Sequence, residues 1–269
     1  MPVEFGIVTD ELSDNPREAI EMALGWGIRL FEIRGANGVR FPRHRDDTLD
    51  TLIALREEYA IEYTAVSPGF FKCHLEDAEQ VDYALGEGLE IAMDFMEACE
   101  TPVLICFGFE MDTGTDDEAV SRLRELADRL AERNLAAAVE NETHCKLNTP
   151  DRIDALLRRL GRPNLGANWD LGNLKEGARD GFPAGYELVK PHIQNVHAKD
   201  VALLPDGTTE WKPIGEGVCD WPGQMRALAR DGVVDHVTIE NHCGPPEKVG
   251  LHNLETLQRY LADAGGGKW

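Results

Sequence analysis

Short apolar runs alternate with longer amphipathic segments along the whole chain, and no other feature limits the possible folds as strongly. Strands that alternate with helices in this way are typical of parallel βαβ units. Eight apolar runs are predicted to be strands, at residues 3–8, 28–33, 61–66, 102–107, 135–140, 165–170, 193–197 and 237–240. Helices are predicted at residues 16–25, 48–59, 117–133 and 252–264, and another is predicted to begin at Thr149-Pro150-Asp151.

Eight such units within 269 residues predict closure into one barrel. The competing fold is an open, doubly wound sheet, which usually carries a glycine-rich phosphate loop after its first strand. Here the first strand is followed by TDELSDNP, which has no glycine. No linker or low-complexity tract divides the chain. We therefore predict the fold class α/β, with a single (β/α)8 TIM barrel as the one domain over residues 1–269.

The chain carries 49 Asp and Glu residues against 27 Lys and Arg residues, a formal net charge of −22. Such a surface repels phosphate backbones and lipid headgroups, so we expect neither a nucleic acid nor a membrane as a partner. No run approaches the roughly 20 apolar residues that a membrane-spanning helix needs. The acidic excess also suggests a halophilic source, because salt screens the self-repulsion of such a surface.

The cysteines and the N-terminal residues bear on the compartment of the protein. Six cysteines are scattered without a Cys-x-x-Cys pair, which predicts reduced thiols rather than a disulfide framework. The first residues, MPVEFGIVTDEL, contain neither a basic leader nor a small-residue cleavage site. We therefore expect a cytoplasmic protein.

Four consecutive predicted strands end on residues that can bind a divalent metal: Glu140, Asp170, His197 and Glu240. The carboxyl ends of the strands form the active-site face of a TIM barrel, so we expect these side chains to meet there. Three carboxylates and one imidazole suit one divalent metal ion, and they favour Mn²⁺, Mg²⁺ or Co²⁺ over Zn²⁺. Such an ion would polarise a substrate carbonyl and stabilise an enediolate.

The sequence resembles the xylose isomerase-like TIM barrel superfamily of sugar isomerases and epimerases. The resemblance covers nearly the whole chain and rests on VEN at Glu140, NWDLGN around Asp170, NVHAKD around His197, IGEGVCDW ending at Trp221, and TIEN at Glu240. It implies that the four strand-end residues bind one metal ion, and that Glu140 and Glu240 also form an acid/base pair. One glutamate would remove a proton next to a carbonyl, and the other would return it.

Further residues at or just beyond the strand ends are candidates for substrate contacts. Lys199 is expected to contact a substrate carboxylate, hydroxyl or phosphate, or to pair with an acidic neighbour. Glu32 and Arg34 close the second predicted strand, where they would hold either the substrate or each other. Many members of the superfamily that the sequence resembles carry a second histidine at the position of Asn173. The asparagine at this position argues against a multi-metal site. The substrate-binding candidates are Glu32, Glu142, His144, Trp169, Asn173, Lys199 and Glu216, and the aromatic candidates for the site wall are Phe70, Phe71, Trp169 and Trp211.

Two reactions remain open for such a site. The first is isomerisation or epimerisation of a ketose or sugar phosphate. The second is dehydration of an inosose or dehydroshikimate type of substrate, in which loss of a hydroxyl follows the same enolisation. An abasic-site endonuclease is disfavoured because histidines of a three-metal cluster are missing, and a non-catalytic barrel is disfavoured by the complete ligand set. The sequence does not determine whether the substrate is phosphorylated or whether the protein forms a homo-oligomer.

Overall fold

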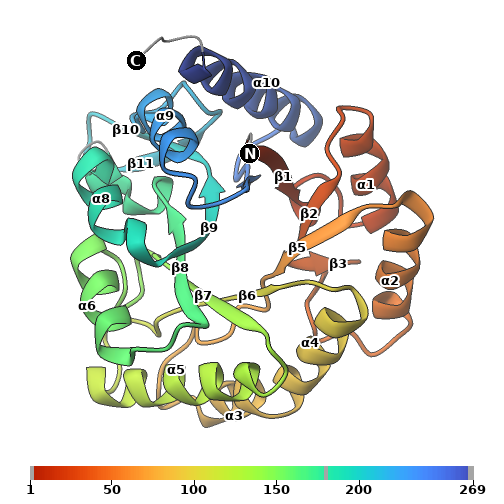
Figure 1. The fold of residues 1–269 in the computed structure, drawn as a ribbon, viewed down its shortest axis with the longest axis vertical. Coiled ribbons are helices and arrows are strands. Elements are labelled where there is room, and N and C mark those ends of the chain that lie inside the picture. Colours follow the sequence, from red (N-terminus) through yellow and green to blue (C-terminus); the bar gives the residue numbers. More distant parts are fainter. Residues whose placement is uncertain (1–2, 179–180, 266–269) are drawn as a thin grey trace.

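Eight parallel strands close into a barrel within residues 3–178 and 181–265, the residues that the computed structural model describes (Figure 1). Each neighbouring pair in the barrel is parallel. The predicted (β/α)8 TIM barrel is therefore confirmed, and each predicted strand is observed within two residues of its expected ends. In barrel order the strands are β1 (Glu4–Val8), β12 (His236–Ile239), β9 (Ile193–Ala198), β8 (Leu165–Asp170), β7 (Ala136–Glu140), β6 (Val103–Cys106), β5 (Glu62–Val66) and β2 (Leu30–Ile33).

Helices surround the strands on the outside of the barrel (Figure 1). The α-helices are α1 (Pro16–Leu24), α2 (Thr48–Tyr59), α3 (Ala78–Leu85), α4 (Glu87–Ala98), α5 (Asp116–Ala131), α6 (Pro150–Leu160), α8 (Tyr186–Val189), α9 (Trp221–Asp231) and α10 (Pro246–Gly265). Shorter helical turns are η1 (Thr9–Glu11), η2 (Gly172–Gly177), η3 (Gly181–Gly185) and η4 (Lys190–His192). Helices α3, α4, α8 and α9 are not predicted by the sequence pattern, and α10 begins at Pro246 instead of the predicted residue 252.

Local sequence signals explain where several helices begin. Asn15 caps α1 by accepting hydrogen bonds from two backbone N–H groups of the first turn, and Pro16 follows it. Helix α5 begins with a capping box, in which Thr115 and Glu118 each bond the backbone N–H of the other. Thr149 precedes α6 as expected, but its side chain makes no capping hydrogen bond. Pro246 begins α10, a position where the missing N–H of proline costs nothing.

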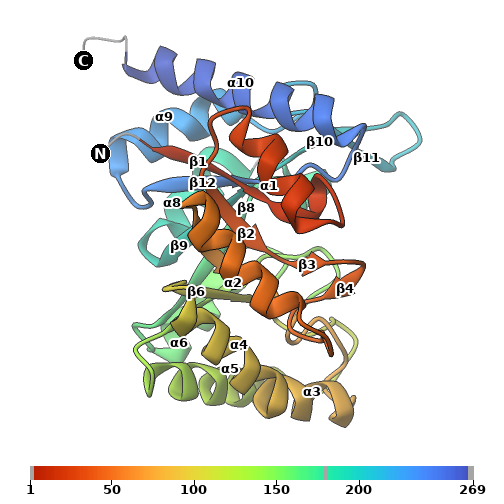
Figure 2. The same ribbon diagram turned by 90° about the vertical axis from the view of Figure 1, so that its right-hand side faces the viewer.

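Two short hairpins extend beyond the barrel. Strands β3 (Gly35–Ala36) and β4 (Val39–Arg40) follow β2, and β10 (Asp200–Leu203) and β11 (Thr209–Lys212) follow β9. Both hairpins lie at the end of the barrel toward which β1 runs from the N terminus (Figure 2). They therefore border the carboxyl ends of the strands, where the sequence predicts the active site.

The core has an apolar layer between strands and helices, to which nearly every strand and α-helix contributes. All six cysteines are free, in agreement with the predicted absence of a disulfide framework. Among the described residues, no helix combines the length and apolarity needed to cross a membrane.

Candidate metal centre

The structure brings Glu140, Asp170, His197 and Glu240 together at the carboxyl ends of β7, β8, β9 and β12. One potential ligand atom from each residue lies within 4.8 Å of the corresponding atoms of the other three. All four side chains are buried. Asp170 is the register partner of His197 across β8 and β9. A shared position at the strand ends therefore assembles the cluster from residues that are distant in sequence.

The alternation of side chains along β8 decides which residues enter the barrel. Asp170 and Asn168 are two residues apart and share the inward face, whereas Trp169 between them points to the opposite face. The indole Nε1 of Trp169 donates a hydrogen bond to Gln224 Oε1 on α9 at 3.0 Å, and the side chain is fully buried. The prediction that Trp169 binds substrate or lines the site is therefore wrong, because the residue packs between the barrel and its outer helices.

His197 is held between Glu32 and the cluster. Its Nε2 lies 2.7 Å from Glu32 Oε2, and its Nδ1 lies 3.2 Å from Glu240 Oε2 and 3.6 Å from Glu140 Oε2. Burial opposes the charged imidazolium, but the three glutamates raise the pKa of His197 well above its usual value. The geometry leaves Nδ1 as the nitrogen that faces the cluster. Glu32 thus orients His197, although the sequence suggested a substrate contact for this residue.

The ammonium of Lys199 lies among the same carboxylates. Its Nζ is 2.6 Å from Glu240 Oε2, 2.9 Å from Asp170 Oδ2 and 3.9 Å from Glu140 Oε1. The side chain is only 2% exposed. Burial opposes the charge, but these carboxylates hold the pKa of Lys199 well above its usual value. Lys199 therefore provides a buried positive charge that compensates the cluster.

The pKa values of the three cluster carboxylates shift in different directions. Burial alone would raise the pKa of Glu240 and of Glu140, but Lys199 and His197 lower both below the usual value, strongly for Glu240. Asp170 behaves in the opposite way: burial outweighs the attraction of Lys199 and raises the pKa of Asp170 to about 6. Asp170 Oδ2 is also buried without a well-directed hydrogen bond, although Lys199 Nζ is close.

The second oxygen of Glu240 faces a further set of charged groups. Arg34 Nη1 donates to Glu240 Oε1 at 2.8 Å, and His242 Nε2 lies 3.0 Å from the same oxygen. Arg34 also pairs with Asp10 at 3.0 Å and with Glu11 at 2.8 Å. Arg34 was expected to pair with Glu32 or with the substrate, but its partners in the structure are three other carboxylates. These groups meet because β1 lies between β2 and β12 in the barrel.

Buried amides hold Glu140 from two sides. Asn173 Nδ2 donates to Glu140 Oε1 at 2.7 Å, and Asn168 Nδ2 donates to Glu140 Oε2 at 3.2 Å. Inside the barrel, Asn195 donates to Asn168 Oδ1 at 3.0 Å, and His236 Nε2 lies 3.1 Å from Asn195 Oδ1. Asn173, expected as a substrate contact, thus positions Glu140. Sequence reasoning missed Asn168 and Asn195, for which the only signal was a polar residue on the inward face of an otherwise apolar strand.

Asp200, directly after Lys199, organises the loop that contains the IGEGVCDW motif. Its fully buried carboxylate accepts hydrogen bonds from the backbone N–H groups of Val201, Gly215, Gly217 and Cys219 at 2.9 to 3.2 Å. Adjacent residues of the HAKD motif therefore have separate tasks. The ammonium of Lys199 pairs with the cluster carboxylates, and the carboxylate of Asp200 holds the loop through hydrogen bonds.

Three other predicted substrate contacts lie outside the cluster. Glu142 is mostly buried and pairs with Lys72 at 2.6 Å. His144 and Glu216 are exposed on loops. The structure therefore does not bring these residues into contact with the four candidate ligands.

Of the predicted aromatic walls, Trp211 is the one that reaches the cluster. Its ring stacks on His242 with 5.2 Å between ring centroids, and Lys199 Nζ lies 5.3 Å from its centroid. Phe70 and Phe71 are buried, and Phe71 stacks on Phe109 in the core. Trp211, carried by the β10–β11 hairpin, thus covers the side of the cluster occupied by Lys199.

The donor set is suited to a divalent cation. It offers three carboxylates and one imidazole nitrogen, which hard and borderline divalent ions accept as ligands. The nitrogen opposite the cluster is held by Glu32, the usual arrangement for a metal-binding histidine. Asp170 Oδ2 accepts no well-directed hydrogen bond, and its charge is balanced by Lys199 Nζ at 2.9 Å. The residues present therefore fit one divalent metal ion, but they do not identify the metal.

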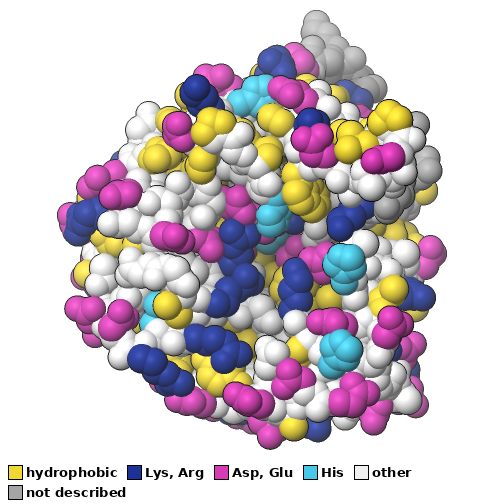
Figure 3. All heavy atoms as spheres, turned by 180° about the vertical axis from the view of Figure 1, so that it is seen from behind, with side chains coloured by type: hydrophobic (Ala, Val, Ile, Leu, Met, Phe, Trp, Pro, Cys, Tyr) yellow, Lys and Arg dark blue, Asp and Glu magenta, His cyan; other side chains and the backbone are white. Residues whose placement is uncertain are grey.

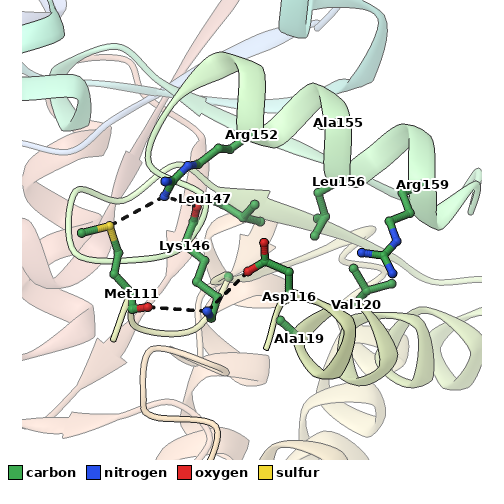
Figure 4. Close-up of a pocket in the computed structure, with 11 residues that line it drawn as sticks. Met111, Asp116, Ala119, Val120, Lys146, Leu147, Arg152, Ala155, Leu156 and Arg159 are labelled. Atoms are coloured by element: carbon green, nitrogen blue, oxygen red, sulfur yellow. Dashed lines mark hydrogen bonds and ion pairs between the residues drawn. The ribbon is translucent and has the colours of Figure 1, made fainter. Parts of the chain in front are cut away.

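A separate groove of about 300 Å³ lies between α5 and α6 (Figure 4). Lys146 and Arg152 lie at one end of it, where Lys146 Nζ is 3.4 Å from Asp116 Oδ1 and Arg152 Nη1 is 3.8 Å from Met111 Sδ. None of the four candidate ligands lines this groove. It is therefore distinct from the metal centre.

Comparisons with known proteins agree with this fold. A sequence model of the family described as xylose isomerase-like TIM barrel matches residues 20–260. No curated protein matches the sequence. Among solved structures, D-allulose 3-epimerase from Methylomonas sp., in complex with D-allulose, is 16% identical, with a TM-score of 0.76 and coverage of 96% of this chain and 97% of that chain.

Two further solved structures show the same fold. A probable 3-DHS dehydratase from Bacillus anthracis is 17% identical, with a TM-score of 0.77 and coverage of 95% of this chain and 99% of that one. A xylose isomerase-like TIM barrel protein from Mycobacterium smegmatis, in complex with magnesium, is 15% identical, with a TM-score of 0.74 and coverage of 98% and 97%. The scaffold thus occurs in proteins named for epimerisation and for dehydration.

Proposed function

We propose that this protein, which belongs to the xylose isomerase-like TIM barrel family, is a divalent-metal-dependent isomerase or epimerase of a ketose or sugar phosphate. The observation that carries the proposal is the convergence of Glu140, Asp170, His197 and Glu240, whose ligand atoms lie within 4.8 Å of one another. Solved structures with the same fold include an epimerase with bound D-allulose and a barrel protein with magnesium, which supports this class of reaction.

In this proposal Glu140 and Glu240 both bind the metal ion and transfer the proton. They come from β7 and from the residue after β12, and β8 and β9 separate these strands in the barrel. A substrate between them would present a C–H bond to one carboxylate. The other carboxylate would return the proton, either to the neighbouring carbon or to the opposite face of the same carbon. A bound divalent ion would act as a Lewis acid that polarises the substrate carbonyl.

The surroundings of each glutamate support its role. The amides of Asn168 and Asn173 hold both oxygens of Glu140, whereas Arg34 and His242 hold one oxygen of Glu240. Fixed carboxylates lose less entropy on reaching the reactive geometry. Trp211 covers the cluster beside Lys199 and helps to exclude water.

The second candidate reaction is dehydration of a cyclic polyol ketone or of a dehydroshikimate type of substrate. The fold shared with a probable 3-DHS dehydratase supports it. Both reactions begin with removal of a proton next to a carbonyl, and the dehydratase then expels a hydroxyl group. Product mass distinguishes them, because only the dehydratase product is lighter by one water.

The test combines metal analysis with isotope exchange. The purified protein, loaded in turn with Mn²⁺, Mg²⁺ and Co²⁺, is incubated in D2O with ketoses, ketose phosphates and an inosose. We expect deuterium at a carbon next to the carbonyl, loss of exchange in Glu240→Gln, and wild-type exchange in Glu247→Gln, a matched change on α10. Absence of exchange across the panel by a protein that has bound the metal would contradict the proposal.

A further inference from the structure

Arg40 is the last residue of β4, and its guanidinium lies at the mouth of the barrel. Its Nη2 donates to Ser67 Oγ, directly after β5, at 3.4 Å. The guanidinium also packs against Gly69, where a Cβ would lie 3.4 Å from both Nε and Nη2. Gly69 has a φ of +76°, a conformation that suits glycine, and the loop after β5 thereby leaves space for the arginine. Arg40 is therefore held between the carboxyl ends of β2 and β5.

Arg40 differs from its neighbour Arg34 in its ion pairs. Arg34 pairs with Asp10, Glu11 and Glu240, whereas Arg40 forms no ion pair with any residue that the structure describes. The Nε of Arg40 is buried without a hydrogen bond. A guanidinium has five N–H donors, and a buried donor without an acceptor costs free energy. The structure thus contains a partly buried cation whose hydrogen-bonding capacity is largely unused.

The charges that act on Arg40 include those of two candidate metal ligands. Burial, and then the charge of Arg34, lower the pKa of Arg40, while Asp10, Glu240 and Glu140 act in the opposite direction. Figure 3 shows the face of the barrel that carries the hairpins, where Lys and Arg side chains lie beside Asp, Glu and His side chains around a central hollow. The other cations of this mouth that the structure describes are paired with carboxylates, so the guanidinium of Arg40 is the group that favours an anion here.

We propose that Arg40 binds an anionic group of the substrate, a carboxylate or a phosphate, while the reacting carbons lie over the metal centre. The planar guanidinium can bind either group with two parallel hydrogen bonds. This inference rests on the proposed function and narrows its substrate class to acidic sugars and sugar phosphates. Lys72, another cation near this mouth, is already paired with Glu142, which leaves Arg40 as the better anion receptor.

The first test measures anion binding by the Mg²⁺-loaded protein. Inorganic phosphate and acetate are titrated separately by calorimetry into wild type, Arg40→Gln and Arg45→Gln. Arg45 is the matched control because it is exposed and pairs with Glu87. We expect Arg40→Gln to weaken binding of at least one anion by about 10- to 100-fold, as for loss of a hydrogen bond to a charged group, and Arg45→Gln to leave it unchanged. The anion whose binding depends on Arg40 identifies the substrate group as a phosphate or a carboxylate.

The second test measures deuterium exchange with three substrates: an uncharged ketose, a ketose phosphate and a keto-hexuronate. We expect kcat/KM for a charged substrate to fall by about 10- to 100-fold in Arg40→Gln, with the uncharged ketose unaffected. Arg40→Lys, which keeps the charge but not the planar fork, should recover part of the loss and shows that the fold tolerates substitution.

The outcomes separate this inference from the proposed function. Equal anion affinity in wild type and Arg40→Gln, or equal effects on charged and uncharged substrates, would overturn the role of Arg40 and leave the isomerase proposal intact. Anion binding that depends on Arg40, without exchange for any sugar, would support the anion site and refute the proposed reaction.

Discussion

The carboxylate of Glu32 lies behind the imidazole of His197, with 2.7 Å between Oε2 and Nε2. Both side chains are almost completely buried, and they are separated by 165 residues in sequence. The contact fixes the ring so that Nδ1 faces Glu140, Glu240 and the proposed metal ion. The geometry of the centre therefore depends on a residue that is not itself one of the four candidate ligands.

Glu32→Gln should weaken metal binding without removing a ligand. The amide keeps the size of the carboxylate but loses the charge that orients and polarises the ring, so we expect about 10- to 100-fold lower affinity for Mn²⁺. Titration calorimetry measures the change. Glu62→Gln, at an exposed position on β5, serves as the control. Unaltered affinity in Glu32→Gln would show that the contact does not support the metal centre.

Glu140→Gln and Glu240→Gln should each abolish turnover while largely preserving the fold. A glutamine cannot accept or return the proton, and we expect a loss of at least about 100-fold in kcat, the lower end of the usual range for general acid–base catalysis. Activity is followed by the same isotope exchange, and folding by circular dichroism. Normal activity in either variant would refute the role assigned to that glutamate.

Lys199→Met should destabilise the metal-free protein far more than the metal-loaded protein. Removal of the ammonium leaves Asp170 and Glu240 buried without the positive charge nearest to them, and breaking a buried ion pair typically costs about 3–5 kcal/mol. A divalent ion replaces the lost charge and stabilises the folded state by binding to it. Urea unfolding with and without Mg²⁺ measures the difference, with Lys212→Met, at a partly exposed lysine that pairs with Glu210, as control. An equal loss of stability in both states would contradict the charge-compensation argument.

The free energy of unfolding of the metal-free protein should decrease as the pH rises above about 6.5, the usual pKa of histidine. The pKa of His197 is raised in the folded state, so its stabilising contribution is complete below the unfolded pKa and is lost as the pH rises through the folded pKa. The raised pKa of Asp170, about 6, acts in the same direction at lower pH.

Urea titrations between pH 6 and pH 9 test this dependence. His197→Asn should lose most of the slope above pH 6.5, because its side chain does not titrate. The exposed His144→Asn should keep the wild-type slope. A flat profile for the metal-free wild type would show that the imidazolium does not stabilise the cluster.

The alternation of apolar and amphipathic segments determined the barrel, and the strand ends determined Glu140, Asp170, His197 and Glu240 as candidate ligands. Both follow from chain order, because consecutive parallel strands place their carboxyl ends at one edge. The missed helices α3 and α4 directly follow one another and are separated only at Gly86, so the pattern of one helix between two strands did not reveal them.

The tertiary structure alone decided what surrounds the four ligands. Trp169 points outward because its neighbours on β8 point inward, and Asn173 bonds Glu140 because η2 turns back over β7. Glu32 meets His197, and Arg34 rather than Arg40 pairs with Glu240, through contacts between distant parts of the chain. Local sequence patterns report periodicity and element ends, whereas these partners depend on barrel register and closure, which only the folded chain specifies.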